Sequence, residues 1–431
     1  MIKFMPEPRL LESPRGRDWP RPLTAPTPPT GLPLPTRANV VIVGAGPAGL
    51  AVAGALWHLG VRDVVLVDRD GRPCHRFFDR IDRLGQRVLR SPYEHHPGVE
   101  GYRDCELLDF ARLHWSRLTH DERGEIRMAQ SGHRSVVPVD VFDAYCRHIA
   151  AVHQVTERTW QATVTQVHPI RGGLVVGTDR GAIDARFVVL CQGEERRQAP
   201  AGWQGGHWDE PVPASARSVV VVGAGLSSAH IIADALASGR KVHWVVRETE
   251  ERYQCADVNA SFFRPEGRAK FDAGSWADRL TLMSRHRRAS VMFEFQPLLR
   301  AAEADGRLTV HRGSAVADAR IGAVRLANGE TVVGDHVVFA LGTTPSIGTG
   351  LLPADIVAAR DGWPDLDQRT LAYRADPRVF VVGAAACMVL GPAARNIDGH
   401  RVATARVAAA IAARSGVTAG TRRPLEVGAL V

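Results

Sequence analysis

The sequence predicts an α/β protein in which one doubly wound domain is interrupted by a second one. Two observations predict this arrangement. Short apolar runs typical of buried strands alternate with helix-like stretches, which indicates parallel sheets covered by helices on both faces. In addition, one pattern of strand, glycine-rich turn, helix and strand occurs twice. Its segments are 40–43, 48–59 and 64–67 in the first copy, and 218–222, 226–237 and 242–246 in the second.

The rest of the chain divides around these two copies. Two stretches, 71–104 and 253–290, carry no clear period and are expected to be irregular. Helices are expected near 107–118, 139–153 and 397–414, and further strands near 159–167, 173–178, 187–191, 307–311, 315–320, 322–327, 336–340 and 379–382. The predicted segments are a proline-rich leader at 1–37, a first domain at 38–212 and 335–416, an inserted domain at 213–334, and a tail at 417–431.

Composition narrows the class of protein. The chain has 431 residues and a formal net charge of +8, which suits phosphate-bearing ligands. No apolar run approaches the ~20 residues of a membrane span, and the first residues lack the apolar region of a secretory signal. Arginines are spread along the chain rather than clustered, which argues against a nucleic-acid partner. We therefore expect a soluble cytoplasmic protein that binds neither membrane nor nucleic acid.

The cysteines indicate neither a disulfide scaffold nor disulfide exchange, because no two of them are close in sequence. A metal site is not expected either, since no third ligand at a suitable spacing joins the pair His95 and His96. The six cysteines are Cys74, Cys105, Cys146, Cys191, Cys255 and Cys387.

The first glycine turn, GAGPAG at 44–49, has the G-x-G-x-x-G pattern of a dinucleotide site. Gly44 permits the tight turn, Gly46 lets the backbone approach a pyrophosphate, and Gly49 lets helix and strand pack closely. Asp68 ends the next strand, 24 residues after Gly44 (68 − 44), where a carboxylate accepts hydrogen bonds from an adenosine ribose. The alternative is a plain βαβ unit with a glycine turn.

The second turn, GAGLSS at 223–228, keeps Gly223 and Gly225 but has Ser228 in place of the third glycine. Counting the same 24 residues from Gly223 reaches Arg247 (247 − 223). A carboxylate repels a 2′-phosphate, whereas an arginine binds it with charge-assisted hydrogen bonds. The first site is therefore expected to hold an unphosphorylated adenosine and the second NADPH. The alternative for Arg247 is a solvated arginine at a strand end.

Two such turns 179 residues apart (223 − 44), the first with Asp and the second with Arg, resemble the two-dinucleotide-binding-domain flavoproteins. The segments FVVLCQG at 187–193 and VVFALGTTP at 337–345 are similar to those that leave the two domains of that family. VFVVG at 379–383 resembles its last FAD strand. The stretches 86–115 and 137–145 resemble the NADPH-dependent flavin monooxygenases, and among these the lysine and ornithine N-hydroxylases.

The resemblance implies a Rossmann-like FAD domain interrupted by a Rossmann-like NADPH domain. It implies that NADPH reduces FAD, that the reduced flavin reacts with O2, and that one oxygen atom passes to a small-molecule substrate, as in N-hydroxylation of an amine or amino acid. Gly383 and the helix that begins after Asn396 would contact FAD, although Asn396 is also suited to capping that helix. Arg90 is a candidate for binding NADP+ or a substrate carboxylate, and His95 or His96 for moving a proton. The alternative for this stretch is a surface loop with incidental histidines.

One position departs from the family pattern. Ala384 follows Gly383, where the family usually carries an Asp that contacts the ribityl chain of FAD. Two alternatives therefore stay open: an NADPH-dependent flavin reductase or dehydrogenase without oxygen insertion, and a catalytically silent dinucleotide-binding protein. The identity of the substrate and the oligomeric state stay open as well.

Overall fold

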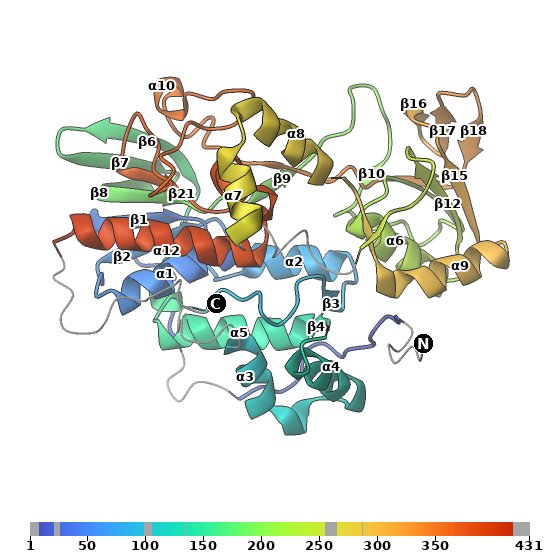
Figure 1. Cartoon of the computed structure of the whole chain (residues 1–431), viewed down its shortest axis with the longest axis horizontal. Helices are drawn as coiled ribbons and strands as arrows, with labels where there is room; N and C mark the ends of the chain where they lie inside the picture. Colours follow the sequence, from blue (N-terminus) through green and yellow to red (C-terminus); the bar gives the residue numbers. More distant parts are fainter. Residues whose placement is uncertain are drawn as a thin grey trace.

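The computed structural model describes residues 8–20, 26–98, 106–133, 135–254, 265–286 and 288–416. These residues form two lobes, each built around one sheet (Figure 1). The first sheet has the order β5-β2-β1-β8-β7-β6, and β21 also pairs with β8. Its strands are β1 (Arg37–Val43), β2 (Val64–Asp68), β5 (Thr159–Gln161), β6 (Val164–Ile170), β7 (Gly173–Thr178), β8 (Gly181–Leu190) and β21 (Val379–Val381).

The centre of the first sheet is parallel because its strands are apolar on both faces. Residues 40–43 of β1 and 64–67 of β2 are all buried, and β1 pairs in parallel with both β2 and β8. Strands of this kind need cover on each side. Helices α1 (Pro47–His58) and α12 (Ile397–Arg414) pack against each other beside the sheet, and α5 (Val139–Val152) packs on α1 (Figure 1).

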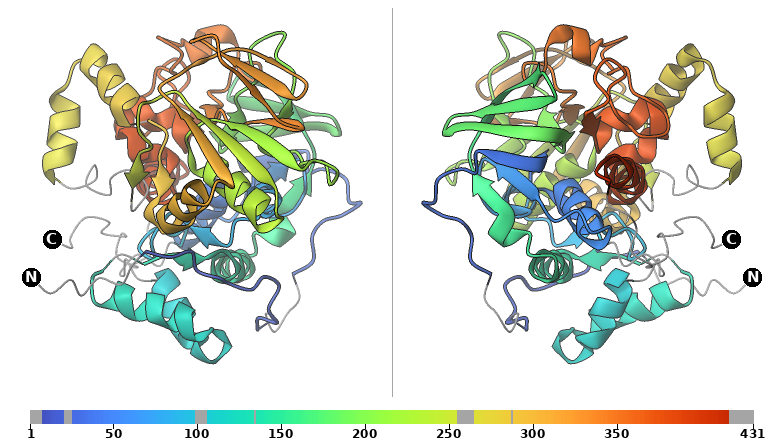
Figure 2. Two further views of the ribbon diagram at one scale, coloured as in Figure 1. Left: turned by 90° about the vertical axis from the view of Figure 1, so that its right-hand side faces the viewer. Right: turned by 90° about the vertical axis from the view of Figure 1, so that its left-hand side faces the viewer.

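The second lobe contains an all-parallel sheet in the order β10-β19-β11-β12-β15 (Figure 2). Helices α6 (Leu226–Ala237) and α9 (Gln296–Ala304) contact this sheet, and an antiparallel meander extends it outward. The sheet reaches beyond the predicted range 213–334 at both ends, through β10 and β19. The strands are β10 (Gly206–His207), β11 (Ser218–Val222), β12 (Lys241–Val246), β15 (Leu308–Arg312), β16 (Val316–Arg320), β17 (Ala323–Leu326), β18 (Thr331–Val333) and β19 (His336–Phe339).

Shorter elements join the lobes and cover their edges. They are β3 (Val88–Leu89), β4 (Val137–Pro138), β9 (Glu194–Arg196), β13 (Tyr253–Gln254), β14 (Val291–Met292), β20 (Thr343–Pro345), α2 (His75–Arg83), α3 (Glu106–Leu113), α4 (His120–Gln130), α7 (Pro265–Ala273), α8 (Trp276–His286), α10 (Ala354–Val357) and α11 (Cys387–Leu390).

The repeated units confirm the sequence prediction, since α1 and α6 begin and end within one residue of the expected helices. The expectation of irregular chain at 71–104 and 253–290 was wrong, because these stretches contain α2, α7 and α8. Helix α2 buries only Phe78 and Ile81, so its apolar pattern is too sparse to stand out. The prediction also omits α4, although Thr119 and Glu122 form a capping box at its start.

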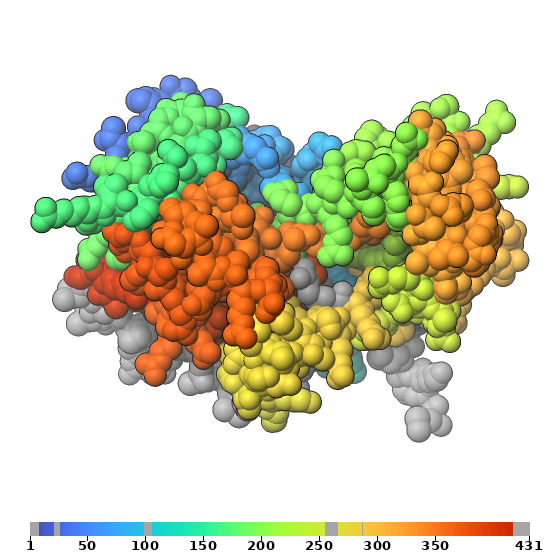
Figure 3. Space-filling model, turned by 90° about the horizontal axis from the view of Figure 1, so that it is seen from above, coloured from blue at the N-terminus to red at the C-terminus, as the bar shows by residue number. Residues whose placement is uncertain are grey.

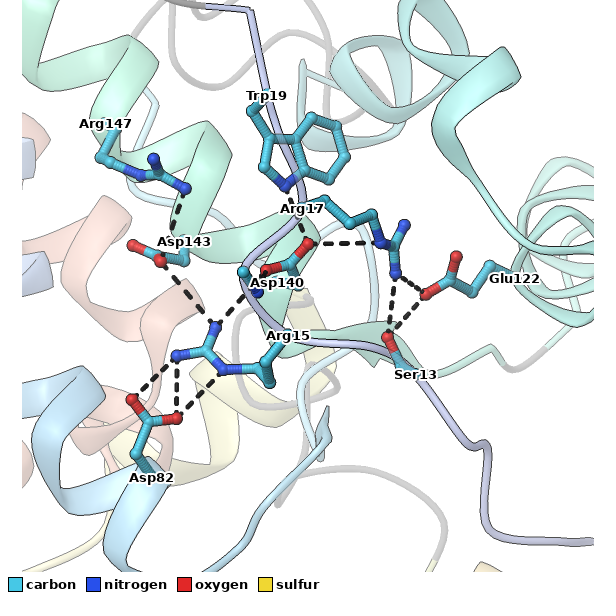
Figure 4. Close-up of polar contacts among 10 residues, drawn as sticks. Ser13, Arg15, Arg17, Trp19, Asp82, Glu122, Asp140, Asp143 and Arg147 are labelled. Atoms are coloured by element: carbon cyan, nitrogen blue, oxygen red, sulfur yellow. Dashed lines mark hydrogen bonds and ion pairs between the residues drawn. The ribbon is translucent and has the colours of Figure 1, made fainter.

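Residues 8–20 of the leader are bound to the first lobe by buried ionic contacts (Figure 4). Arg17 pairs with Glu122, and its Nε lies 3.3 Å from Oδ2 of Asp140. The indole Nε1 of Trp19 donates to the same oxygen of Asp140 at 2.8 Å. Glu122 and Asp140 are 0% and 1% exposed, so the leader supplies the cation for two buried carboxylates of α4 and α5.

The leader also contacts the second lobe. Leu11 is 6% exposed and belongs to the apolar cluster that contains Val88 from the first lobe and Ile231 from α6. Arg15 meanwhile pairs with Asp82 of α2 at 2.8 Å. The segment therefore fastens to both lobes instead of lying free at the surface.

Within the described residues, no helix has the length and apolarity that a membrane span requires. The same residues contain no group of three or more His, Cys, Asp or Glu side chains placed to hold a metal ion. Four cysteines, Cys74, Cys146, Cys191 and Cys387, are buried and form no disulfide, and Cys105 and Cys255 lie outside the described residues.

Candidate functional site

A cleft of about 1470 Å³ lies between the lobes and is lined by both glycine turns. Figure 3 shows the molecule hollowed between the two lobes when it is seen from above. The turns follow β1 and β11, and the carboxyl ends of parallel strands are where open α/β sheets bind ligands. The fold thus brings the two predicted dinucleotide sites into one cavity.

The first turn excludes side chains where the strands meet. Gly44 has a φ of +99°, and a Cβ on it would lie 2.6 Å from the carbonyl oxygen of Cys191 at the end of β8. A Cβ on Gly49 would lie 2.1 Å from the carbonyl oxygen of Gly44. By contrast, no atom lies within 4 Å of the Cβ position of Gly46, so the open cleft reaches the backbone there.

Two kinds of ligand-binding group surround Gly46. Gly46 is the N-cap of α1 and makes no side-chain capping bond, so the unpaired N–H groups of the first turn remain for an anion. Asp68 lines the same cleft, where its Oδ2 accepts from Ala45 N at 2.8 Å and its Oδ1 from Asp70 N at 2.9 Å. A carboxylate has about four acceptor positions, which leaves capacity for ribose hydroxyls.

The second turn repeats this geometry with other residues. Gly223 has a φ of +131°, and a Cβ on it would lie 2.3 Å from the carbonyl oxygen of Ala340 at the end of β19. Gly225 has no atom within 4 Å of its Cβ position. Ser228 is 0% exposed and occupies the place that the third glycine takes in the first turn. The backbone at Gly225 therefore opens to the cleft as it does at Gly46.

Arg247 follows β12 and lines the cleft beside the second turn. Its side chain is 79% exposed, and its nearest ionic contact is Glu248, at 3.2 Å. Such an arginine can reorient toward a phosphate at little cost. The turn itself is held from behind by Trp244, whose Nε1 donates to Gly223 O at 2.6 Å.

The cleft carries more cationic than anionic side chains. Its carboxylates are Asp68, Asp70, Glu194, Glu195, Glu248 and Glu250. Its arginines are Arg69, Arg76, Arg80, Arg90, Arg197, Arg247, Arg252, Arg288 and Arg395. An excess of three positive charges (9 − 6) in a concave site attracts phosphate-bearing ligands.

The three candidate catalytic residues are separated by the fold. Arg90 lines the cleft, and its guanidinium donates to Ser290 Oγ at 2.8 Å. His95 and His96 are 4% and 2% exposed and do not line the cleft. His96 Nδ1 lies 3.2 Å from the hydroxyl of Tyr145, which makes His96 part of a buried polar contact.

Gly383, which follows β21, and Asn396, which precedes α12, both line the cleft. Gly383 has a φ of +104°, which only glycine adopts easily. Ala384 is 3% exposed and brings no polar group. Asn396 is the N-cap of α12, but its side chain makes no capping bond, so capping does not explain this residue.

Sequence reasoning missed a polar cluster where the chain passes between the lobes. Nη2 of Arg395 lies 2.7 Å from Oε2 of Glu194, and Thr343 Oγ1 donates to the same oxygen at 3.0 Å. Strands β9 and β20, which carry Glu194 and Thr343, pair antiparallel here. No short motif marks the cluster, because Arg395 is 201 positions from Glu194.

His400, in the first turn of α12, was missed as well. It lines the cleft, and its Nε2 lies 3.6 Å from the Cβ position of Gly383. Its Nδ1 is buried and has no hydrogen-bond partner in the described part of the chain. Burial lowers the pKa of His400 to about 4, so its imidazole is neutral at pH 7. The available signal was its spacing of four from Asn396, which places both side chains on one side of the helix.

Comparison with known proteins supports the first site by sequence. A family model described as an FAD binding domain matches residues 37–91, which span β1, α1, β2 and α2. No protein with a curated description matches the chain in sequence.

Solved structures match the whole architecture. An ornithine N-hydroxylase from Kutzneria sp. 744, described with reduced FAD, NADP+ and L-ornithine, has a TM-score of 0.70 at 20% identity over 88% of this chain and 100% of that one. The cadaverine monooxygenase of Erwinia amylovora bound to FAD has a TM-score of 0.68 at 16% identity, over 90% of this chain and 96% of that one. A bacillithiol disulfide reductase from Bacillus cereus has a TM-score of 0.58 at 17% identity, over 88% of this chain and 99% of that one. These likenesses confirm the predicted fold of two dinucleotide-binding domains.

Proposed function

We propose that the chain is an FAD- and NADPH-dependent monooxygenase that transfers one oxygen atom from O2 to the nitrogen of a small amine or amino acid. One observation carries the proposal. A single cleft is lined by two glycine turns of the same geometry, and Asp68 follows the first where Arg247 follows the second. Asp68 suits an unphosphorylated ribose and Arg247 a 2′-phosphate, so a flavin and its reductant would share one cavity.

The first lobe fits FAD. The N-terminus of α1 at Gly46 would bind the pyrophosphate, and Asp68 would bind the ribose of the adenosine half. Gly383 and Asn396 would contact the flavin half from β21 and α12. When bound, FAD supplies a group that accepts two electrons and reacts with oxygen. The residues of the chain orient it and exclude water from it.

The second lobe fits NADPH. The N-terminus of α6 at Gly225 would bind the pyrophosphate, as α1 does in the first lobe. Arg247 would bind the 2′-phosphate with charge-assisted hydrogen bonds. The excess of arginines around the cleft supports a ligand with this much negative charge.

The substrate class rests on the ornithine and cadaverine enzymes, since both named substrates are amines. Arg90 is the candidate that the cleft supports: it lines the cavity, and its bond to Ser290 orients it. We propose that Arg90 binds a carboxylate of the substrate or a phosphate of NADP+. The proton-transfer role of His95 and His96 stays a prediction, to which their buried positions outside the cleft lend no support.

Reconstitution tests the proposal. The purified chain would be saturated with FAD, and NADPH oxidation, peroxide release and product mass would be followed with ornithine, lysine and cadaverine in turn. We expect one of these amines to speed NADPH oxidation and to gain one oxygen atom, with peroxide well below the NADPH consumed. Failure to bind FAD, or release of one peroxide per NADPH with every amine, would reject the proposal.

The second candidate is a flavin-dependent reductase, which the fold shared with the disulfide reductase of Bacillus cereus favours. The four described cysteines are buried, and burial raises the pKa of the Cys191 thiol beside the first turn, which disfavours a reactive thiolate there. Steady NADPH oxidation with a disulfide substrate, but with no amine, would favour this candidate.

A further inference from the structure

The flavin side of the cleft lacks the acidic side chain that the flavoprotein resemblance leads one to expect. Ala384 stands at that position and is 3% exposed, so it contributes only a methyl group. The neighbouring backbone keeps its specialised form, because Gly383 has a φ of +104°. The glycine conformation at the end of β21 is therefore present without an acidic side chain after it.

His400 faces this place from the opposite element. Its Nε2 lies 3.6 Å from the Cβ position of Gly383, and it lines the same cavity as Gly46 and Asn396. Side chains in a helix lean toward its N-terminus, and the N-terminus of α12 lies at the cleft. The imidazole is thus placed beside Gly383, the residue before Ala384, and both Ala384 and His400 line the cavity.

One ring nitrogen of His400 has no partner in the part of the chain that the structure describes. Nδ1 is buried and has no hydrogen-bond partner among the described residues, which is uncommon for a buried polar atom. The negative charge of Glu194 acts on the pKa of His400, but Oε2 of Glu194 accepts its hydrogen bonds from Arg395 and Thr343. A ligand that brought its own donor or acceptor groups would satisfy the imidazole.

We propose that His400 holds the ribityl chain of FAD by hydrogen bonds and so replaces, from α12, the carboxylate that Ala384 lacks at the end of β21. A ribityl chain carries hydroxyl groups that both donate and accept. A neutral imidazole has one nitrogen of each kind and complements them. Burial lowers the pKa of His400 to about 4, which keeps the ring neutral at pH 7. His400 is then a cofactor-positioning residue, and this inference rests on the proposed function because it requires FAD in the first lobe.

Titration of the apoprotein with FAD, riboflavin and ADP tests the inference without any turnover. His400→Leu replaces the imidazole by an apolar side chain of similar size that forms no hydrogen bond, so the packing of α12 is preserved. We expect His400→Leu to weaken FAD and riboflavin binding roughly 10- to 100-fold, because one or two buried hydrogen bonds are lost. ADP binding should be unchanged, because ADP has no ribityl chain. His400→Asn retains a donor and an acceptor and should lose less than His400→Leu.

A rescue and a control complete the experiment. Adding Ala384→Asp to His400→Leu should restore FAD affinity at least in part, because the carboxylate returns on the other side of the same contact. His230→Leu removes another buried histidine, on α6 in the second lobe, and should leave FAD affinity unchanged. The unfolding midpoint of each apoprotein shows whether the variant is folded.

Two results overturn the inference while leaving the proposed function in place. The first is a wild-type affinity for FAD in His400→Leu. The second is an equal loss of FAD and ADP affinity, which would place His400 at the pyrophosphate. If the wild-type protein binds no FAD, this inference and the proposed function fall together.

Discussion

The two glycine turns share one backbone geometry but differ in what holds it. In the first lobe, Ala45 is fixed on both sides: its N–H donates to Asp68 and its carbonyl accepts from Cys74 N, each at 2.8 Å. In the second lobe, Trp244 holds the carbonyl of Gly223, and Arg247 is left with a side chain that is 79% exposed. The first turn is bonded to Asp68, the side chain proposed to bind its ligand, whereas the ionic contact of Arg247 is with Glu248.

This difference suggests how the same turn geometry can suit two kinds of ligand. A carboxylate that is already held in place loses little conformational entropy when a ligand binds, which favours a cofactor that stays bound. A solvent-exposed arginine must be ordered by each ligand that arrives, which favours a ligand that is exchanged. The structure thus suits a resident FAD in the first lobe and an exchanging NADPH in the second.

Exchanging the third residue between the turns should have the largest effect. Gly49→Ser gives the first turn the residue of the second, but its Cβ would lie 2.1 Å from the backbone oxygen of Gly44. Backbone atoms cannot move aside as a side chain can. We expect FAD binding to be lost and stability to fall by roughly 3 kcal/mol or more in urea unfolding.

The reciprocal change, Ser228→Gly, is the matched control. It gives the second turn the residue of the first and removes a buried side chain from α6. It should cost about 1 kcal/mol of helix stability and leave NADPH affinity unchanged. Similar losses in both variants would show that the two turns are packed alike, contrary to the distances at Gly49.

A smaller, more selective effect is expected at the ribose position. Arg247→Ala removes the proposed partner of the 2′-phosphate, so NADPH should bind roughly 10- to 100-fold more weakly, as expected for hydrogen bonds to a charged group. NADH lacks that phosphate and should bind as before. Titration with both nucleotides checks the prediction, and an equal loss for NADH would contradict it.

Acid should destabilise the second lobe through one buried histidine, which is a further, modest effect. His230 on α6 takes the place that Ala51 has on α1 (230 − 179), and burial lowers the pKa of His230 to about 3. As the pH falls below about 6.5, the unfolded chain binds a proton that the folded one refuses. Stability present at neutral pH is therefore lost between pH 6.5 and 3, by about 2 kcal/mol at pH 5.

Urea unfolding at pH 7 and pH 5 measures this loss. His230→Leu should reduce the difference between the two pH values, whatever its stability at pH 7. An unchanged difference would show that His230 is protonated in the folded protein.

The sequence was informative where short-range chemistry determines structure. Gly44, Gly49 and Gly223 could be read from spacing alone, because each is required by a backbone approach within one βαβ unit. The helices after these turns were predicted for the same reason, since apolar strands and the glycine turns between strand and helix are local signals.

Contacts between distant segments could not be read in this way. His400 is adjacent to Gly383 only because α12 folds back on β21, and Arg395 meets Glu194 across 201 positions. His95 and His96 show the converse error: their composition was typical of a catalytic loop, but the fold buries both outside the cleft. Residue type indicated reactivity, and only packing decided access.

The docked leader has a consequence for the order in which the molecule assembles. Trp19 leaves the ribosome early, but its partner Asp140 is synthesised 121 residues later, and the partner of Ser13, Glu122, 109 residues later. Residues 8–20 therefore dock only after α4 and α5 have emerged, and until they dock Glu122 and Asp140 lack the contact with Arg17. Expression from residue 38 onward would make that unfinished state permanent.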